Sequence, residues 1–347
     1  MSELTEPRTT PAARPAGRAR ALPPVLVTRA LAPGVLERLT PFCEVTLHGD
    51  DEPMPRAALL AAVRGTAAVI TTLGDTVDAE FLDAAGSGLR IVANHAVGTH
   101  NVDAAACAER GVLVSNTPGV LTEATADLAW ALLLAATRRL GEGERLLRSG
   151  RPWSWAPNML LGLELGGTPL GILGMGRIGQ AVARRARAFG MPVGYHNRTP
   201  LSEAARDGAE WLPLDDLLAR STVLVVTCPL TAATRHLLDA ERLARLPQGA
   251  VVVSMTAGIV DELALADALD SGALFAAAVD NFEHEPAVPA RLLAQERAVL
   301  VPHLGSATVR TRRAMGDLAV DNVLAVLAGD APPTPVGPPA RISPPPT

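Results

Sequence analysis

The sequence contains no lysine, so all 31 of its basic residues are arginine. Aromatic residues are also scarce, at 3%, and the only three cysteines are Cys43, Cys107 and Cys228, without C-x-x-C spacing. This pattern excludes a disulfide framework and a zinc cluster of the usual kind. We therefore expect no bound metal and a protein of the reducing cytoplasm.

A strong charge of one sign is absent as well. The 31 basic and 36 acidic residues give a net charge of -5, which offers no broad attraction to nucleic acid or to anionic lipid. The longest apolar run, Leu128 to Ala136, is far shorter than the ~20 residues of a membrane-spanning helix. We expect neither nucleic acid nor a membrane as a partner.

The ends of the chain are rich in proline. Residues 1–24 hold five of the 29 prolines and residues 331–347 hold eight, and the N-terminal segment has no apolar core of a secretory signal. We expect a disordered leader over residues 1–23 and a disordered tail over 331–347. The 347-residue length predicts about two domains between them.

Short β-branched runs alternate with helical patterns in two series, the first from Val25 to Gly119 and the second from Leu170 onward. The first series includes a helix expected near Gly34–Leu39. Such alternation predicts parallel strands joined by crossover helices. The fold class is therefore α/β, with two doubly wound parallel-sheet domains.

A long helix is expected between the two series, with Thr122 as a plausible N-cap and an end near Leu140. It is apolar on nearly every face. This predicts burial, either against another domain or subunit or within one domain.

A G-x-G-x-x-G motif lies between a predicted strand and a predicted helix, with glycines at Gly174, Gly176 and Gly179. These glycines allow, in turn, a tight turn, approach of the backbone to a pyrophosphate and close helix packing, and the helix N-terminus attracts the negative charge. The motif predicts a dinucleotide site, with a merely tight turn as the alternative. Arg177 and Ile178 are predicted to join it, Arg177 by reaching phosphate unless it only covers the helix surface.

The strand after this helix ends without an acidic residue. A carboxylate that holds the ribose 2′-hydroxyl is expected about 20 residues past the motif, but the sequence there reads His196, Asn197, Arg198, Thr199. Asparagine removes repulsion toward a 2′-phosphate, and the planar guanidinium of Arg198 suits it. We expect NADP in preference to NAD, held by Asn197, Arg198 and Thr199. Alternatively, Arg198 is solvated and stacks on an adenine, which permits either cofactor.

The sequence resembles the NAD(P)-dependent D-2-hydroxyacid dehydrogenase family, and within it the glyoxylate/hydroxypyruvate reductase branch. The likeness covers most of residues 25–329 and includes ANHAVGTHNVD, GILGMGRIGQAVARRARAFGM, VDNFEHEP and VPHLGSAT in this order. It implies a Rossmann NAD(P)-binding domain over 122–306, inserted into a flavodoxin-like substrate domain over 24–121 and 307–330. It also implies hydride transfer to a small 2-oxoacid and a homodimer.

The resemblance assigns roles to single residues. His303 matches the family's acid/base and Glu285 its partner, since a carboxylate stabilises an imidazolium and fixes its tautomer. Asp280 matches the residue beside the nicotinamide, or is an ordinary acid at a strand end. Leu73, Gly74, Val97 and Gly98 match loops that contact the substrate; alternatively, their glycines only form turns. Cys228, Pro229 and Thr231 match the loop under the adenosine; alternatively, Cys228 is only a small buried apolar residue.

One residue of the family pattern is absent. The family usually reads N-T-A-R-G, then two residues and V-D-E, and its arginine binds the substrate carboxylate. Here the sequence is SMTAGIVDE, so Ala257 stands at the arginine position and one residue is missing after Gly258. Loss of a hydrogen bond to a charged group costs ~1.5 to 3 kcal/mol, so the absence of this arginine weakens substrate binding or catalysis if no other group compensates.

Three explanations are open. Another cation takes over, either His95, His100 or an arginine of the Arg310 to Arg313 segment. The substrate carries a different head group, such as a phosphonate. Or the chain is a cofactor-sensing binding protein. The presence of both His303 and Glu285 favours catalysis, because a sensor needs neither.

Overall fold

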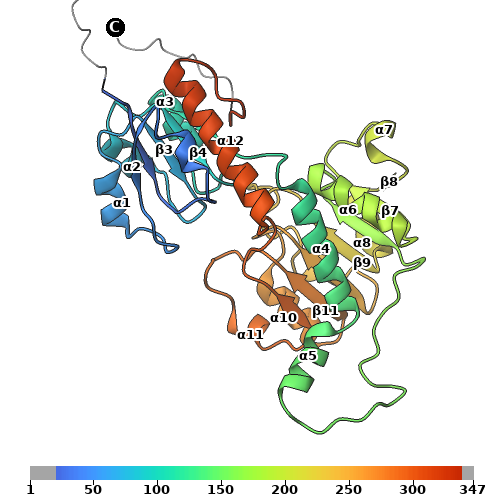
Figure 1. The fold of residues 1–347 in the computed structure, drawn as a ribbon. Helices are drawn as coiled ribbons and strands as arrows, with labels where there is room; N and C mark the ends of the chain where they lie inside the picture. The colour runs from blue at the N-terminus through green and yellow to red at the C-terminus, as the bar shows by residue number, and fades with distance from the viewer. Residues whose placement is uncertain (1–20, 338–347) are drawn as a thin grey trace, which may run out of the picture.

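The computed structural model describes residues 21–337 and confirms the α/β fold with two parallel sheets (Figure 1). One sheet has five strands and the other has seven. The figure shows them in two lobes, with the first sheet in blue and the second in green to orange. Most of the expected leader and the end of the expected tail lie outside the described residues.

The first sheet has a flavodoxin-like strand order, and all neighbouring strands are parallel. Its strands are, in spatial order, β2 (Glu44–Leu47), β1 (Pro24–Val27), β3 (Ala68–Thr71), β4 (Ile91–Asn94) and β5 (Leu113–Ser115). β3 and β4 are buried along their whole length. Burial on both faces explains their continuous apolar runs.

Short helices join these strands: the 3-10 helix η1 (Leu36–Arg38), α1 (Arg56–Ala62), α2 (Ala79–Ala85) and α3 (Ala104–Glu109). Aspartates begin two of them, since Asp78 accepts from the amide of Phe81 and Asp103 from that of Ala106. The expectation of a helix over Gly34–Leu39 is only partly correct. Gly34 has a φ of +83°, outside the helical region, so a single 3-10 turn forms after it.

The second sheet places β6 between β7 and β9, the reversal of strand order at which doubly wound sheets bind ligands. Its neighbouring strands are all parallel. The strands are, in spatial order, β12 (Ala298–Leu300), β11 (Leu274–Val279), β10 (Ala250–Ser254), β9 (Val223–Val226), β6 (Leu170–Leu173), β7 (Val193–His196) and β8 (Glu210–Trp211).

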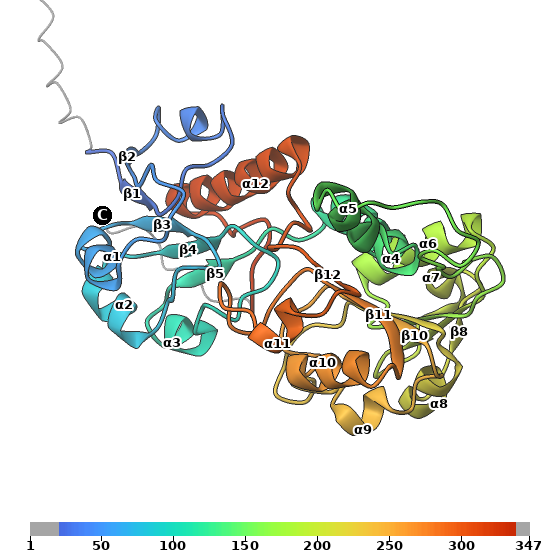
Figure 2. The same ribbon diagram turned by 90° about the horizontal axis from the view of Figure 1, so that it is seen from below.

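Helices cover both faces of this sheet, and apolar cores fill the space beneath them. They are α6 (Arg177–Ala188), α7 (Glu203–Arg206), α8 (Leu214–Arg220), α9 (Ala240–Leu243), α10 (Glu262–Asp270) and α11 (Ala290–Leu293). The view in Figure 2 shows α9 and α10 on one side of the strands, and α6 together with α4 (Thr122–Thr137) toward the other.

The long apolar helix is α4 (Thr122–Thr137), and it packs on α6, β10 and β11. Trp130 illustrates this burial, because its indole donates to the backbone oxygen of Val182 and stacks on Phe189. Of the two expected kinds of burial, the structure shows burial within the lobe of the second sheet. The expectation that Thr122 caps the helix is wrong: Leu121 already has helical φ and ψ and is the N-cap, without a side-chain hydrogen bond.

The chain continues through α5 (Leu140–Arg148) and returns to the first sheet at its end through α12 (Val309–Ala328). α12 lies beside β3 and β4 in Figure 2, and its Val320 and Val323 join the core of that sheet. Beyond it, Thr334 bonds to Asn322, and the amide of Val336 bonds to Val114. Ordered structure thus extends past residue 331, where the sequence placed the start of a disordered tail.

Across residues 21–337, the structure contains no helix with the length and apolar character needed to cross a membrane.

Candidate active site

The residues that the sequence singled out follow the carboxyl ends of parallel strands. In doubly wound sheets, ligands bind at this edge. Leu73 and Gly74 follow β3, and Val97 and Gly98 follow β4. On the second sheet the sites follow five strands: the glycine loop after β6, Asn197 to Thr199 after β7, Cys228 to Thr231 after β9, Asp280 after β11 and His303 after β12.

The three motif glycines have different surroundings. Gly174 has a φ of +97°, and a Cβ there would lie 2.3 Å from the amide nitrogen of Cys228. A Cβ on Gly179 would lie 2.6 Å from the carbonyl oxygen of Gly174. Around Gly176, the N-cap of α6, a Cβ would meet no atom within 4 Å. The backbone is therefore packed on both sides of one open position, a cradle suited to a close-lying pyrophosphate.

Asn197 holds this loop in place. Its Oδ1 accepts a hydrogen bond of 2.7 Å from the amide of Met175, the residue between the first two motif glycines. The sequence suggested a role for Asn197 toward the ribose, but this tether was not foreseen. Arg177, Arg198 and Thr199 are exposed, and within residues 21–337 the side chain of neither arginine forms a hydrogen bond or ion pair.

The loop after β9 packs under the glycine loop. Cys228 is 8% exposed, and burial raises the pKa of its thiol to about 11, which keeps it protonated at neutral pH. Pro229 and Thr231 are exposed, and both are tied to Thr234. Ile178 is half-buried and packs against the core of the second sheet.

His303 and Glu285 form a pair. Nδ1 of His303 lies 3.0 Å from Oε2 of Glu285, and Oε1 of Glu285 accepts a hydrogen bond of 3.0 Å from the amide of Phe282. Burial alone would raise the pKa of Glu285, but the hydrogen bond and charge of His303, the Phe282 amide and the charge of His100 together lower it. The carboxylate is thus held ionised against the ring.

The backbone at His303 has a φ of +54°, an uncommon conformation for a residue with a side chain. Asp280 fixes this conformation. Its two carboxylate oxygens accept from the amides of Leu304, at 2.6 Å, and Gly305, at 3.1 Å, and its carbonyl oxygen accepts from the amide of His303. Burial raises the pKa of Asp280, and those two amides with the charge of His303 offset part of the rise. These are the backbone bonds of a strand-end acid.

Two asparagine side chains fix the backbone of the loop after β4. Asn116 donates to the carbonyl oxygen of Val97, and Asn94 donates to that of Gly98. The amide groups of Val97 and Gly98 donate no hydrogen bond to any residue of the described chain. Both residues are exposed, so these amides are available to an anion. Leu73 is half-buried and Gly74 is exposed in the neighbouring loop.

The histidines proposed to replace the missing arginine are poor cations. His95 is 8% exposed, and burial, with the nearby charge of Arg312, lowers its pKa to about 4. The pKa of His100 is also lowered, by desolvation first and by His303. Neither ring is therefore mainly charged near neutral pH.

Among the arginines at the start of α12, Arg310 is exposed, and Arg313 pairs with Asp317. Arg312 is half-buried and forms no hydrogen bond or ion pair through its side chain with the rest of residues 21–337. Burial lowers its pKa, against the charge of Asp280, but a guanidinium stays protonated in proteins. Arg312 is thus an unpaired cation within electrostatic reach of both Asp280 and His95.

Ala257, which follows β10, brings no charge to the site. It is half-buried, and the next residue, Gly258, has a φ of +71°. A Cβ on Gly258 would lie 3.3 Å from the side chain of Leu230. The shortened loop therefore lies against the segment that follows β9.

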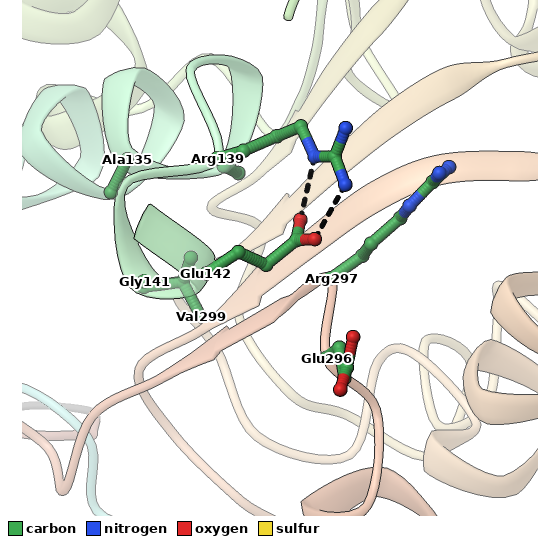
Figure 3. Close-up of a pocket in the computed structure, with 8 residues that line it drawn as sticks. Ala135, Arg139, Gly141, Glu142, Glu296, Arg297 and Val299 are labelled. Carbon is green, nitrogen blue, oxygen red and sulfur yellow. Dashed lines mark hydrogen bonds and ion pairs between the residues drawn. The ribbon is translucent and has the colours of Figure 1, made fainter. Parts of the chain in front are cut away.

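A pocket elsewhere in the protein is lined by a structural ion pair. It has room for about 10 Å³, and none of the predicted site residues lines it. Figure 3 shows Arg139 and Glu142 pointing toward one another. Two hydrogen bonds, of 2.8 and 2.6 Å, join the guanidinium to the carboxylate. The hydrogen bond from Arg139 is the main reason for the lowered pKa of Glu142.

One side chain at the site was not singled out from the sequence. Asn281 lies between Asp280 and the buried Phe282, and its amide nitrogen contacts the ring of His303. A polar residue directly after an apolar strand, within VDNFEHEP, was the available signal.

Comparisons with known proteins place the chain among dehydrogenases. Residues 130–305 match the family model described as D-isomer specific 2-hydroxyacid dehydrogenase, NAD binding domain. A glyoxylate reductase of Thermococcus onnurineus is 43% identical over 318 residues, which cover 90% of this chain and 95% of that protein. A glyoxylate reductase of Aeropyrum pernix is 44% identical over 318 residues, again 90% and 95% of the two chains.

Solved structures agree. The NADPH-dependent glyoxylate/hydroxypyruvate reductase of Sinorhizobium meliloti, in complex with NADP and malonate, has a TM-score of 0.80 and 38% identity, covering 91% of this chain and 97% of that one. A protein of Thermus thermophilus has a TM-score of 0.85 and 46% identity, covering 90% and 99%.

Proposed function

This chain belongs to the D-isomer specific 2-hydroxyacid dehydrogenase family of NAD(P)-dependent oxidoreductases, and we propose that it reduces a small 2-oxoacid, such as glyoxylate or hydroxypyruvate, to the D-2-hydroxyacid. The observation that carries the proposal is the His303 and Glu285 pair, 3.0 Å apart at the carboxyl edge of the second sheet. The names of the relatives support the substrate class.

The residues of the glycine loop fit a nicotinamide dinucleotide. Gly176 leaves an open position between two tightly packed glycines, and the N-terminus of α6 lies directly behind it. When bound there, the cofactor supplies a hydride to the carbonyl carbon of the substrate. Arg177 and Arg198, exposed beside this loop, would contact phosphate. We propose NADP as the preferred cofactor, because Arg198 suits a 2′-phosphate and no acid stands next to it.

His303 supplies the proton. Nδ1 of His303 is hydrogen-bonded to Glu285. Nε2 is therefore the ring nitrogen that donates a proton to the substrate carbonyl oxygen as negative charge develops on that oxygen. The Glu285 carboxylate stabilises the imidazolium before the transfer and keeps the proton of the neutral ring on Nδ1 afterwards. Asp280 acts through the backbone, because its bonds to the Leu304 and Gly305 amides hold the loop that carries His303.

The substrate carboxylate needs an anchor in place of the missing arginine. We propose Arg312 together with the free amides of Val97 and Gly98. A half-buried guanidinium without a partner is costly, and an anionic ligand would satisfy it. His95 contacts both segments: it lies two residues before Val97, and its Nε2 is 3.4 Å from the backbone carbonyl oxygen of Arg312.

We further propose a homodimer in the cytoplasm. The apolar character of α4 no longer supports the dimer, because that helix is buried within its own lobe. Support comes instead from the segment after α4, where Leu147, Trp153, Trp155 and Leu161 are each more than half exposed. Exposed aromatic and aliphatic side chains of this kind mark an interface.

The test is an absorbance assay of NADPH and NADH oxidation with glyoxylate, hydroxypyruvate, pyruvate and phosphonopyruvate. Turnover of a 2-oxocarboxylate with NADPH supports the proposal. Phosphonopyruvate carries a phosphonate in addition to its 2-oxocarboxylate, so its turnover in the absence of turnover of the other three substrates would indicate that the site requires this second anionic group. Tight NADPH binding without any turnover would favour a cofactor-sensing protein and would contradict the proposed reaction.

A further inference from the structure

The peptide group between Val97 and Gly98 is held by a side chain at its carbonyl oxygen. Nδ2 of Asn116 donates a hydrogen bond of 2.8 Å to the carbonyl oxygen of Val97. This peptide is trans, so the C=O of Val97 and the N–H of Gly98 point in opposite directions. The Gly98 N–H therefore points away from Asn116, and it forms no hydrogen bond within residues 21–337.

Asn116 is itself fixed by the segment that follows α12. Its carbonyl oxygen accepts a bond of 2.6 Å from Oγ1 of Thr334, and its backbone amide donates to the Thr334 carbonyl oxygen at 3.3 Å. The buried Asn322 of α12 binds Thr334 twice: it donates to Oγ1 at 2.8 Å and accepts from the Thr334 amide at 3.0 Å. Hydrogen bonds thus connect α12, through Thr334 and Asn116, to the Val97 carbonyl oxygen.

The same segment also covers an edge of the first sheet. β5 is an edge strand of that sheet, and its last residue, Ser115, pairs with Pro335 in an isolated antiparallel bridge. Unpaired edge strands invite aggregation, and backbone bonds alone are enough to cover this one. The side chains of Asn116 and Thr334 form additional bonds that a covered edge does not require, and these bonds lead to the loop after β4.

We propose that Asn116 is a positioning residue that directs the Gly98 N–H toward the substrate carboxylate, and that Thr334 holds Asn116 in place. This inference rests on the proposed function, in which the free amides of Val97 and Gly98 bind that carboxylate. Direction matters because a hydrogen bond weakens steeply as its angle departs from linearity. Since Ala257 supplies no cation here, the amides account for a larger share of carboxylate binding.

The neighbouring peptide group has its own support. Nδ2 of Asn94 donates to the Gly98 carbonyl oxygen at 2.9 Å and contacts Oδ1 of Asn101 at 3.1 Å. The amide of Asn101 in turn donates to the Thr72 carbonyl oxygen at 2.9 Å. These bonds remain in a variant at position 116, so its loss should turn one peptide group and leave the rest of the loop attached.

The experiment measures carboxylate binding and turnover separately, in the whole protein with bound NADP. The probe is oxalate, a dicarboxylate of the size of glyoxylate without an aldehyde or ketone carbonyl. Its Kd is obtained from the amide signal of Gly98 in NMR spectra of ¹⁵N-labelled protein, and Gly98→Ala identifies that signal. The KM and kcat for glyoxylate are measured with saturating NADPH.

Three variants test the two side chains. Asn116→Leu removes the donor at similar size and adds no charge. Thr334→Val removes the hydroxyl and keeps the shape, whereas Thr334→Ser keeps the hydroxyl. The matched control is Thr66→Val, which removes a buried hydroxyl bonded at 2.8 Å to the Val63 carbonyl oxygen, before β3 and at the opposite end of that strand from the substrate loop.

Asn116→Leu should raise the Kd for oxalate and the KM for glyoxylate by about 10-fold, because a bond to a charged ligand is misdirected. Its kcat and its Kd for NADPH should stay near the native values. Thr334→Val should raise both constants by about 3- to 10-fold, since it acts through Asn116, and Thr334→Ser should keep them native. Thr66→Val should lower the unfolding temperature without moving either constant, as a purely structural role would.

Native values of both constants in Asn116→Leu overturn the inference, and if that variant does not fold, native values in Thr334→Val do so. If Asn116→Leu responds and Thr334→Val does not, the role of Thr334 is overturned. A Gly98 signal that oxalate does not move in the native protein also contradicts the inference. The proposed function fails separately: if these effects occur but the native protein reduces no 2-oxoacid, the positioning stands and the reaction is wrong.

Discussion

The carboxylate of Glu285 is bound at both ends, by Nδ1 of His303 at 3.0 Å and by the amide of Phe282 at 3.0 Å. The second bond fixes the orientation of the carboxylate toward the ring. Phe282 lies two residues past Asp280, which holds the loop that carries His303. The segment after β11 therefore orients both the Glu285 carboxylate and the His303 loop.

Replacing Glu285 with glutamine should weaken both the reaction and the pH response of stability. Loss of a charged hydrogen bond corresponds to a fall of roughly 10- to 150-fold in kcat/KM for reduction at neutral pH. The pKa of Glu285 lies below the ordinary 4.5, so its ionisation stabilises the fold above that pH, and the contribution is lost as pH falls through the lowered pKa.

Urea denaturation of the native protein and of Glu285→Gln tests the second part. The difference in unfolding free energy should be largest near neutral pH and should shrink in acid. A difference that stays constant down to the most acidic conditions would show that the ionised carboxylate does not stabilise the fold.

Arg198→Ala should raise the KM for NADPH by about 10- to 150-fold, because a charged bond to the 2′-phosphate is lost. The KM for NADH, which lacks that phosphate, should change little. The matched control is Arg206→Ala, which removes a nearby guanidinium that pairs with Glu203. Equal changes for both cofactors would contradict the assignment.

Two glycine variants should separate folding from cofactor binding. A methyl group on Gly179 would lie 2.6 Å from the Gly174 oxygen, so Gly179→Ala should lower the unfolding free energy by about 1 to 3 kcal/mol and weaken binding of both cofactors. Gly176→Ala has open space and an ordinary φ of -80°, so the variant should fold and lose no more than about 1 kcal/mol, the cost of alanine at an N-cap.

The Gly176→Ala protein should nevertheless bind NADPH poorly, since the methyl group occupies the place of the pyrophosphate. Thermal unfolding and fluorescence titration with NADPH measure the two effects. Native affinity in the Gly176→Ala protein would show that the phosphates lie elsewhere.

Arg312→Gln should raise the KM for glyoxylate by about 10- to 150-fold and leave the Kd for NADPH near its native value. Arg310→Gln, on the same turn of α12 but exposed, is the control and should behave as the native protein does. If both variants keep the native KM, another group anchors the substrate, and the free amides of Val97 and Gly98 are the next candidates.

The sequence predicted the two sheets well, because strands buried on both faces leave continuous apolar runs such as Val223–Val226. It also placed the candidate site residues after the ends of predicted strands, since glycine spacing and the order of motifs depend on local sequence. The roles of these residues stay predictions. The wrong or partial predictions concern local geometry. Leu121 rather than Thr122 begins α4, because backbone angles set by the preceding turn decide the cap.

Contacts between segments that are distant in the sequence could not be predicted from the sequence. The unpaired state of Arg312, the low pKa of His95 and the contact of Asn281 with His303 all depend on how loops from different strands meet. Burial of α4 within one lobe is of the same kind, since apolarity on every face does not say which surface covers it.

The most direct test of the account is the turnover number for glyoxylate reduction by His303→Asn, measured with saturating NADPH beside the native enzyme. Asparagine tolerates the φ of +54° at this position, so the loop keeps its shape while the acid is removed. We predict a fall of roughly 10²- to 10⁴-fold in kcat, with native affinity for NADPH. A variant that retains most of its turnover would contradict the role of His303 as proton donor.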